Sequence, residues 1–492
     1  MLLKDKARKR CGVLLHVASL PSKYGIGTLG QEAYKFIDFL KNSGQSYWQM
    51  LPLVPIGEGN SPYKSTSCYA GEILYIDLDL LIKDGLLSEA DIPHKEFPVN
   101  TDYKAVKEFK TPLIKKAAEN FDTNNRDYKK FCEDQKDWLH DYALFMAIAD
   151  SCGTESVRDF PDDLKYRIPD ALHKFEAEHE KEIRFYEVSQ YFFYAQYFQL
   201  KRYAENNGIG FIGDIPFYVS LDSADVWKYP DSFLLHRDFT PKCVAGVPPD
   251  LFSATGQLWG NPIYDWEYLK ANGYFWWKKR LAHYSRMYDV VRIDHFRAFA
   301  DYYIIPYGNC DARGGEWKLG AGIEFWNEIR KDLGEIDIIA EDLGGDTEIV
   351  QNLVRETGFP NMKVLQFGFS GDPYNPHLPQ NFIENCVCYT GTHDNDTTVG
   401  WYNSLYGYSK TMADELFPQT EELPLPFNFI SAALNSKALL VMIPMQDLLS
   451  LDSSCRMNTP GTPCGNWVWR MEADAISESL AIKLKELSIK RQ

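Results

Sequence analysis

The chain has 492 residues, of which 45% are hydrophobic and 25% are charged, a composition typical of a globular protein with a large core. Its formal net charge of −17 argues against nucleic acid or an anionic membrane as a partner, because both would repel it. Aromatic residues make up 14% of the chain, with 30 Tyr and 12 Trp. We expect some of them to line a cleft, since Tyr and Trp pair an apolar face with a polar tip.

The N-terminus, MLLKDKARKRCGVLLHV, is basic and then apolar, but the apolar run is short and His16 interrupts it. We interpret this stretch as the first strand and not as a signal peptide, because no small-residue cleavage site follows. No apolar stretch approaches the ~20 residues that span a bilayer. The ten Cys are scattered, and without a secretion signal we expect them to be reduced in a cytoplasmic protein.

Short β-rich segments recur along the chain, and each ends in polar, Gly or Pro residues. Helical stretches lie between most of them, so the pattern predicts an α/β protein with a (β/α)8 TIM barrel. The eight predicted strand segments are 12–20, 46–56, 208–219, 290–299, 336–344, 362–369, 385–396 and 438–449.

Two connections between these segments are too long for plain strand-to-helix loops. We expect 1–492 to form a single discontinuous barrel, with 61–189 as a mostly helical insertion after the second strand. Residues 220–272, rich in Pro, Trp and Asp, are predicted to form an insertion after the third strand with a loop that covers the cleft. Both insertions would lie at the C-terminal face of the strands, where barrel enzymes carry their active sites.

The fourth predicted strand, VVRIDHFRAF, opens with apolar β-formers and then becomes charged. A buried parallel strand is apolar along nearly all of its length, so charges at its C-terminal end need another reason. A salt-bridged strand end explains this segment, taken alone, as well as a catalytic role does. The charged or titratable residues are Arg292, Asp294, His295 and Arg297.

Two further strands repeat this design, since Glu341 ends the fifth segment and Asp394 ends the seventh. Three acids that each follow an apolar strand should converge at one end of a barrel. Cleavage of a neutral sugar needs such a set, because one carboxylate attacks the anomeric carbon while a protonated carboxyl donates to the leaving oxygen. A third acid can hold hydroxyls and stabilise positive charge. Arg292, two residues before Asp294 and on the same strand face, would hold Asp294 ionised.

Other chemistries lack their sequence signals. No two His lie at metal-ligand spacing on a helix and no Cys/His cluster is present, so we expect neither a metal nor a cofactor. A phosphate-binding loop would need a Gly-rich turn followed by Lys and Ser or Thr, and that pattern is missing. No G-x-S-x-G nucleophile elbow occurs either.

Three motifs, VRIDHFR, IIAEDLG and YTGTHDNDTT, closely resemble in order and spacing the 4-α-glucanotransferases called amylomaltase or disproportionating enzyme, within the α-amylase clan of retaining glycosidases. The resemblance continues through GVLLHVASLPSKYGIGTLG, SPYKSTSCYAG, GDIPFYV, GVPPDLFSATGQLWGNPIY and RMNTPGTPCGNWVWR. It implies transfer of α-1,4-glucan segments to the 4-hydroxyl of glucose or a maltooligosaccharide. The partners implied are α-1,4-glucans, maltooligosaccharides and glucose. We expect a monomer or a homodimer, and the sequence leaves the choice between them open.

The resemblance also implies residue roles, with Asp294 as nucleophile, Glu341 as general acid/base and Asp394 as transition-state stabiliser. By the same matching, Tyr63 would be an aromatic platform for the glucan. The residues implied to bind substrate are Tyr63, Asp214, Asp250, Phe252, Trp259, Arg292, His393 and Asn458.

Three of these, Asp250, Phe252 and Trp259, fall on the flexible loop that covers the cleft in relatives. His295 is interpreted as a supporting residue. Asp342 is left outside the site, because adjacent residues of a strand face opposite ways.

Three alternative functions are weighed against transfer. The nearest is an α-amylase-like hydrolase, which would release reducing ends, and it stays open. A non-catalytic glucan-binding protein should have lost one of the three acids, and all three are present. A phosphate-dependent glycosyl transfer enzyme is disfavoured by the missing phosphate loop.

Overall fold

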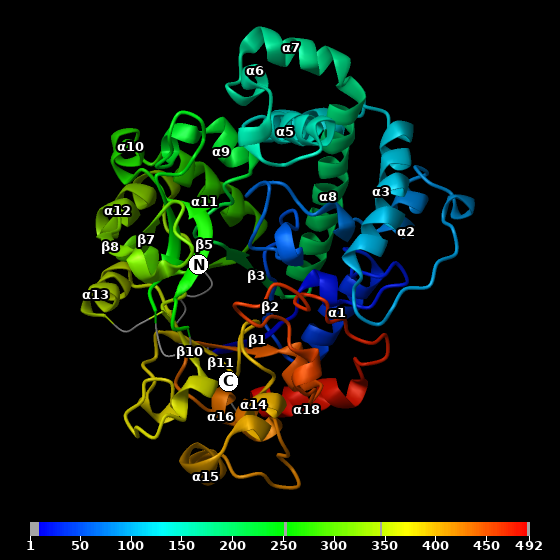
Figure 1. The fold of residues 1–492 in the computed structure, drawn as a ribbon. Coiled ribbons are helices and arrows are strands. Elements are labelled where there is room, and N and C mark those ends of the chain that lie inside the picture. The colour runs from blue at the N-terminus through cyan, green and yellow to red at the C-terminus, as the bar shows by residue number, and fades with distance from the viewer. Residues whose placement is uncertain (1–8, 250–252, 345–346, 490–492) are drawn as a thin grey trace.

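Eight parallel strands close into a barrel in the order β1-β12-β11-β10-β9-β6-β3-β2 (Figure 1). The structure is a computed structural model, and it describes residues 9–249, 253–344 and 347–489. Each barrel strand lies within or overlaps one predicted segment, so the predicted (β/α)8 barrel is confirmed. The strands are β1 (Arg10–Leu14), β2 (Tyr47–Gln49), β3 (Gly210–Ile215), β6 (Val290–Ile293), β9 (Ile338–Ala340), β10 (Asn361–Val364), β11 (Cys386–Tyr389) and β12 (Leu440–Pro444).

Apolar side chains fill the barrel, as the apolar runs in the strands require. One buried cluster includes Ile212, Val290, Ile339 and Met362, from four neighbouring strands. Gly213 allows a close approach from outside, because a Cβ atom there would lie 2.1 Å from the ring of Tyr288. The strand can therefore pack tightly against the chain that leads into β6.

A mostly helical region lies between β2 and β3, as Figure 1 shows in blue to green. Its last helix, α8, runs from this region to β3 and is largely buried along its length. The predicted insertion boundary at residue 189 falls inside α8. The helices are α2 (Leu78–Lys83), α3 (Tyr103–Asn120), α4 (Arg126–Asp134), α5 (Leu139–Cys152), α6 (Asp162–Lys165), α7 (Pro169–Glu178) and α8 (Glu180–Asn206).

A second sheet of four antiparallel strands, in the order β5-β4-β7-β8, stands beside the barrel. Its strands are β4 (Cys243–Val247), β5 (Gln257–Pro262), β7 (Asp301–Pro306) and β8 (Glu316–Leu319). The first two belong to the 220–272 segment. The other two follow β6, and the sequence did not predict them. Residues that follow β6 therefore pair with the 220–272 segment, because β7 pairs with β4.

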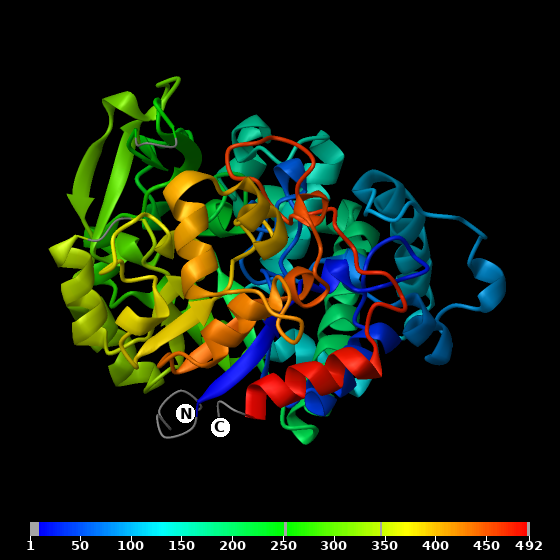
Figure 2. The same cartoon turned by 90° about the horizontal axis from the view of Figure 1, so that it is seen from below.

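The remaining helices pack around the barrel. In the lower part of the molecule, α18 lies alongside α1, and Gln45 Nε2 donates to Ser488 Oγ over 3.0 Å (Figure 2). None of the helices in the described part of the chain has the length and apolarity that crossing a bilayer requires. These helices are α1 (Gln31–Asn42), α9 (Ala224–Lys228), α10 (Trp266–Ala271), α11 (Phe275–Met287), α12 (Gly322–Leu333), α13 (Glu348–Thr357), α14 (Thr398–Ser404), α15 (Gly407–Leu416), α16 (Phe427–Leu434), α17 (Met445–Leu448) and α18 (Glu478–Ile489).

Candidate active site

The acids predicted for catalysis lie at the C-terminal ends of their strands. Asp294 directly follows β6 and Glu341 directly follows β9. The backbone binds these ends together, because the Asp294 N–H donates to the Ile215 carbonyl over 2.9 Å and the Glu341 N–H donates to the Ile293 carbonyl over 3.2 Å. Asp394 lies in the loop after β11, on the same face of the barrel.

The buried side chain of Arg292 links Asp294 to Asp214, an aspartate on β3. Arg292 Nη1 donates to both carboxylate oxygens of Asp214, over 2.7 and 2.6 Å, and Arg292 Nη2 donates to Asp294 Oδ1 over 3.0 Å. The Asp214 side chain is fully buried. Burial by itself lowers the pKa of Arg292, but the charges of Asp214 and Asp294 outweigh burial and raise it. The guanidinium therefore stays charged, and it orients Asp294 as the sequence predicted.

Glu341 is held by two backbone donors. The His295 N–H donates to Oε2 and the Leu343 N–H donates to Oε1, each over 2.7 Å. Burial and the neighbouring charge of Asp294 raise the pKa of Glu341 to about 7, although Arg292 and the two donors oppose the shift. Near neutral pH this carboxyl can therefore give or take a proton, which is what a general acid/base requires.

The backbone of His295 explains how one of these donors reaches Glu341. His295 has a φ of 50°, in the left-handed region that few non-glycine residues adopt. This conformation begins the 3-10 turn Phe296–Phe299, and the His295 N–H faces the carboxyl. Strained backbone of this kind concentrates at functional sites. His295 thus acts through its backbone in this arrangement.

Asp394 is positioned by the segment that follows β12. Asn458 Nδ2 donates to Asp394 Oδ1 over 2.6 Å, and Arg456 Nη2 donates to the Asp394 carbonyl over 2.6 Å. His393 Nε2 lies 3.4 Å from Asp394 Oδ2. Asn458 was predicted to bind substrate, and the structure places its amide against Asp394. Arg456 was not predicted, although it stands in the RMN motif that contains Asn458.

Three aromatic rings form a cluster beside Asp214 and Asp394. The ring of Tyr63 is stacked on that of His393, with centroids 5.3 Å apart and planes at 16°, and it also contacts Trp467 at 5.7 Å. The Tyr63 hydroxyl donates to Asp214 Oδ2 over 2.8 Å. Tyr63 and His393 were predicted as sugar contacts, and the structure brings them together. Trp467, which was not singled out, is buried behind them.

The 220–272 segment reaches this site through Trp259. Its ring meets the ring of His295 edge-on, with centroids 5.0 Å apart, and the His295 backbone donates to Glu341. A single residue, His295, therefore connects Trp259 with Glu341, the predicted general acid/base. Asp250 and Phe252, predicted on the same loop, lie outside the described residues.

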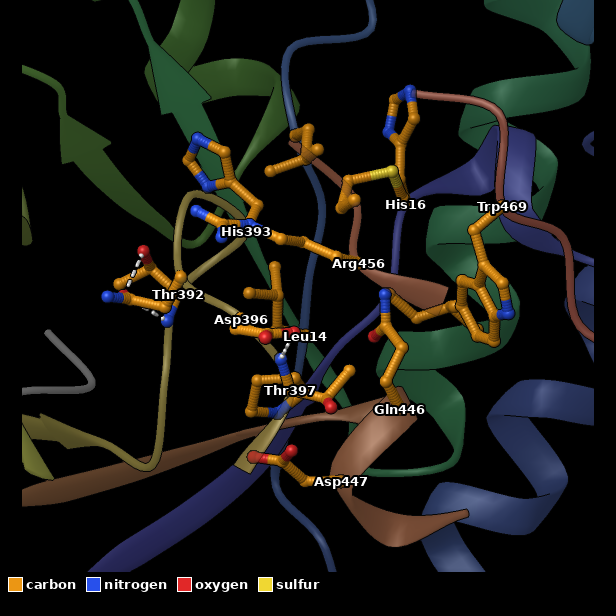
Figure 3. A pocket seen from close by; sticks show the side chains of 15 residues that line it. Leu14, His16, Thr392, His393, Asp396, Thr397, Gln446, Asp447, Arg456 and Trp469 are labelled. Carbon is orange, nitrogen blue, oxygen red and sulfur yellow. Dashed lines mark hydrogen bonds between the residues drawn. The ribbon is translucent and has the colours of Figure 1, made fainter. Parts of the chain in front are cut away.

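A small cavity lies beneath the Asp394 loop (Figure 3). Its volume is about 20 Å³, room for about one water molecule. His16, which interrupts the first apolar run, lines it together with His393, Arg456 and Trp469. Among the described residues, no group of His, Cys, Asp and Glu side chains has the arrangement of a metal site.

A closed parallel barrel with carboxylates and the buried Arg292 at the C-terminal ends of its strands has the architecture of a (β/α)8 barrel enzyme. The family model of the 4-alpha-glucanotransferases, glycoside hydrolase family 77, matches residues 15–476. The chain belongs to this family, and the resemblance and enzyme class predicted from the sequence are confirmed.

Individual relatives match along nearly the whole chain. The 4-alpha-glucanotransferase of Clostridium butyricum is 43% identical over 480 residues, which cover 96% of this chain and 99% of that protein. The 4-alpha-glucanotransferase of Streptococcus pneumoniae strain TIGR4 is 41% identical over 488 residues, covering 98% of this chain and 97% of that protein. The solved amylomaltase from Streptococcus agalactiae in complex with acarbose superposes with a TM-score of 0.94 at 39% identity, covering 98% of this chain and 99% of that chain.

Proposed function

We propose that the protein transfers α-1,4-glucan segments by a retaining double displacement, with Asp294 as nucleophile and Glu341 as general acid/base. One observation carries this proposal, namely the contrast between two neighbouring carboxyls. Burial and the charge of Asp294 raise the pKa of Glu341 to about 7, whereas Asp294 accepts a hydrogen bond from the Arg292 guanidinium. A carboxyl with a raised pKa is suited to act as the acid, and a neighbouring carboxylate that a guanidinium holds in place is suited to act as the nucleophile.

In the first step, Asp294 Oδ2 forms a bond to the anomeric carbon as the bond from that carbon to the bridging oxygen breaks. Glu341 gives its proton to this oxygen, so the leaving segment departs with a free 4-hydroxyl. A covalent glycosyl-aspartate remains. Arg292 holds the other oxygen of Asp294, and Asp394 stabilises the positive charge that develops on the sugar.

In the second step, Glu341 is ionised and takes the proton from the 4-hydroxyl of glucose or of a maltooligosaccharide. The acceptor oxygen displaces Asp294, and the configuration at the anomeric carbon is retained. The carboxyls supply nucleophile, acid and base, so the proposal includes no cofactor. The activity for which the relatives are named supports α-glucans as the substrate class.

Sugar contacts are assigned to side chains that border the acids. His393 and Tyr63 present ring edges beside Asp394 and Asp214. The side chains of Asp214 and Asn458 are engaged with Arg292 and Asp394. Asp214 is fully buried and both of its oxygens are engaged, so it acts as a positioning residue. Asn458 positions Asp394 and can still offer its amide oxygen to a sugar hydroxyl.

Transfer must compete with hydrolysis, because water can also attack the covalent intermediate. Trp259 lies next to the residue that orients Glu341. We assign to it, and to the 220–272 segment whose strand β5 carries it, the exclusion of water and the retention of a sugar acceptor. The alternative function, an α-amylase-like hydrolase, would lack this preference.

The test is the product ladder from maltotriose, resolved by size, with free glucose and total reducing ends counted over time. We expect glucose, maltopentaose and longer glucans at constant reducing ends. Rising reducing ends with only shorter products would make the protein a hydrolase. No turnover by the folded protein would contradict the proposed function.

A further inference from the structure

We propose that three exposed tyrosines form a surface site for long α-1,4-glucans outside the catalytic cleft, an inference that rests on the proposed function. The residues are Tyr374, Tyr406 and Tyr408, named here the tyrosine ledge. Their side chains are 84%, 86% and 68% exposed. Large aromatic side chains gathered at this degree of exposure mark a surface that binds something.

Two chain segments form the ledge. Tyr374 belongs to the loop after β10, and the other two tyrosines stand at the start of α15. Ser409 Oγ donates to the Phe369 carbonyl over 2.8 Å. A Cβ atom on Gly371 would lie 3.4 Å from the ring of Tyr408, so this ring packs over the turn that leads to Tyr374. Figure 1 shows the loop and α15 side by side at the lower edge of the molecule.

A buried aromatic cluster supports the ledge from below. The ring of Phe369 contacts those of Trp401, Phe417 and Phe429, with centroids between 5.1 and 5.9 Å apart. These rings pack against one another beneath the surface without any contribution from the three tyrosines. The tyrosines are therefore surface residues and not core residues that failed to become buried.

The chemistry of the ledge suits a sugar chain. Tyrosine offers a flat apolar face and a hydroxyl tip, and a glucose ring offers C–H faces with hydroxyls at its edge. The exposed neighbours Asn403 and Ser404 are polar and uncharged, so they can exchange hydrogen bonds with sugar hydroxyls. The nearest charged neighbours are Asp372, whose carboxylate accepts a hydrogen bond from the Tyr374 N–H over 2.9 Å, and Lys410. Sugar hydroxyls can also form hydrogen bonds with these groups.

One chain segment connects the ledge with the loop that carries Asp394. Gln366 Nε2 donates to the carbonyl of Asp396 over 2.8 Å, and Asp396 stands two residues after Asp394. Phe369, which anchors the ledge, follows Gln366 by three residues. The proposed site would hold one part of a long glucan while another part of the same chain occupies the cleft. When one part of a glucan is bound at the ledge, the effective concentration of the rest of that chain at the cleft rises. This holds only for glucans long enough to reach both sites.

The experiment compares a triple variant, Tyr374→Ser with Tyr406→Ser and Tyr408→Ser, with a control that carries Tyr166→Ser and Tyr268→Ser. The control tyrosines are 41% and 44% exposed and lie elsewhere on the surface. We expect the ratio of the KM for long amylose to the KM for maltotriose to rise about tenfold in the triple variant. The ratio in the control should match that of the wild type.

Binding is measured separately by retardation of each full-length protein in native gels that contain amylose, with Glu341→Gln added to stop turnover. Loss of retardation only in the ledge variant supports the site, even if the wild type fails to disproportionate maltotriose, which would contradict the proposed function alone. Unchanged retardation and an unchanged KM ratio overturn the ledge. A change in oligomeric size on gel filtration assigns the tyrosines to a contact between copies and also overturns it. If the triple variant misfolds, the single variant Tyr406→Ser carries the same test.

Discussion

The two sides of the active site are built differently. On the side of β3, β6 and β9, charged groups sit at strand ends, and the Arg292 side chain is only 4% exposed while Asp214 is fully buried. On the side of β11, the Asp394 side chain is 43% exposed, and it is held by Asn458 and Arg456 from the segment after β12. The first side belongs to the core of the barrel, and the second is held by loops.

This difference predicts which side of the site contributes to the stability of the fold. Buried charges at strand ends must be paired, because removing one partner leaves the other unsatisfied in a poorly solvating interior. A half-exposed acid held by loop side chains can regain its hydrogen bonds from water. We therefore expect the strand side to carry both folding and chemistry, and the loop side to carry chemistry with little effect on stability.

The largest effect is expected from the three predicted catalytic acids, which both sides of the site contribute. Asp294→Asn, Glu341→Gln and Asp394→Asn should each lower kcat for maltotriose disproportionation by at least about a thousandfold, since each acts on the reacting centre. Initial rates from the product ladder measure this. Glu267→Gln, an exposed acid on α10, should retain wild-type rates. Near wild-type turnover in Asp294→Asn would remove the nucleophile assignment.

Deleting one hydrogen-bond partner on each side tests the comparison directly. Asp214→Asn removes the negative charge that pairs with the buried Arg292 guanidinium. It should therefore lower the free energy of unfolding by about 3–5 kcal/mol. Asn458→Ala should lower it by about 1 kcal/mol or less, while it reduces kcat through misplacement of Asp394. Denaturant unfolding of the two variants measures both values. Equal losses of stability would refute the division into a strand side and a loop side.

The raised pKa of Glu341 predicts a pH dependence on the strand side. Burial and the charge of Asp294 raise that pKa to about 7, and the first step needs the protonated form. The value of kcat/KM for maltotriose should therefore fall as pH rises through about 7. With α-maltosyl fluoride as donor, whose fluoride leaves without a proton, this alkaline limb should vanish. An alkaline limb that is the same for both donors would assign it to another group.

The smallest effect is expected from the 220–272 segment, which contacts the strand side through Trp259. Trp259→Ala removes the edge-on contact with His295, worth about 1 kcal/mol, so the ratio of transfer to hydrolysis should fall roughly fivefold. Counting reducing ends against glucose released gives this ratio. Leu258→Ala, next to it on β5 and 42% exposed, is the control, because adjacent residues face opposite sides. An equal loss of transfer and hydrolysis in Trp259→Ala would take the covering segment out of the mechanism.

The sequence determined the barrel and the location of its acids. Apolar runs that end in charge identify parallel strands whose C-terminal ends meet, and this placed Asp294 and Glu341 directly after β6 and β9. Tyr63 and Trp259 could be singled out only through the family resemblance. Their own surroundings in the chain, a Pro and a Gly-rich loop, carry no signal for the rings they contact.

The tertiary structure alone decided which groups meet. Asp214 pairs with Arg292 because β3 and β6 align these residues in register, and Asn458 reaches Asp394 across 64 residues of chain. The β7–β8 half of the second sheet and the raised pKa of Glu341 also depend on packing between distant segments. Local alternation of apolar and polar residues sets the face on which a side chain lies. Its partner depends on strand register and barrel closure, which are long-range properties of the folded chain.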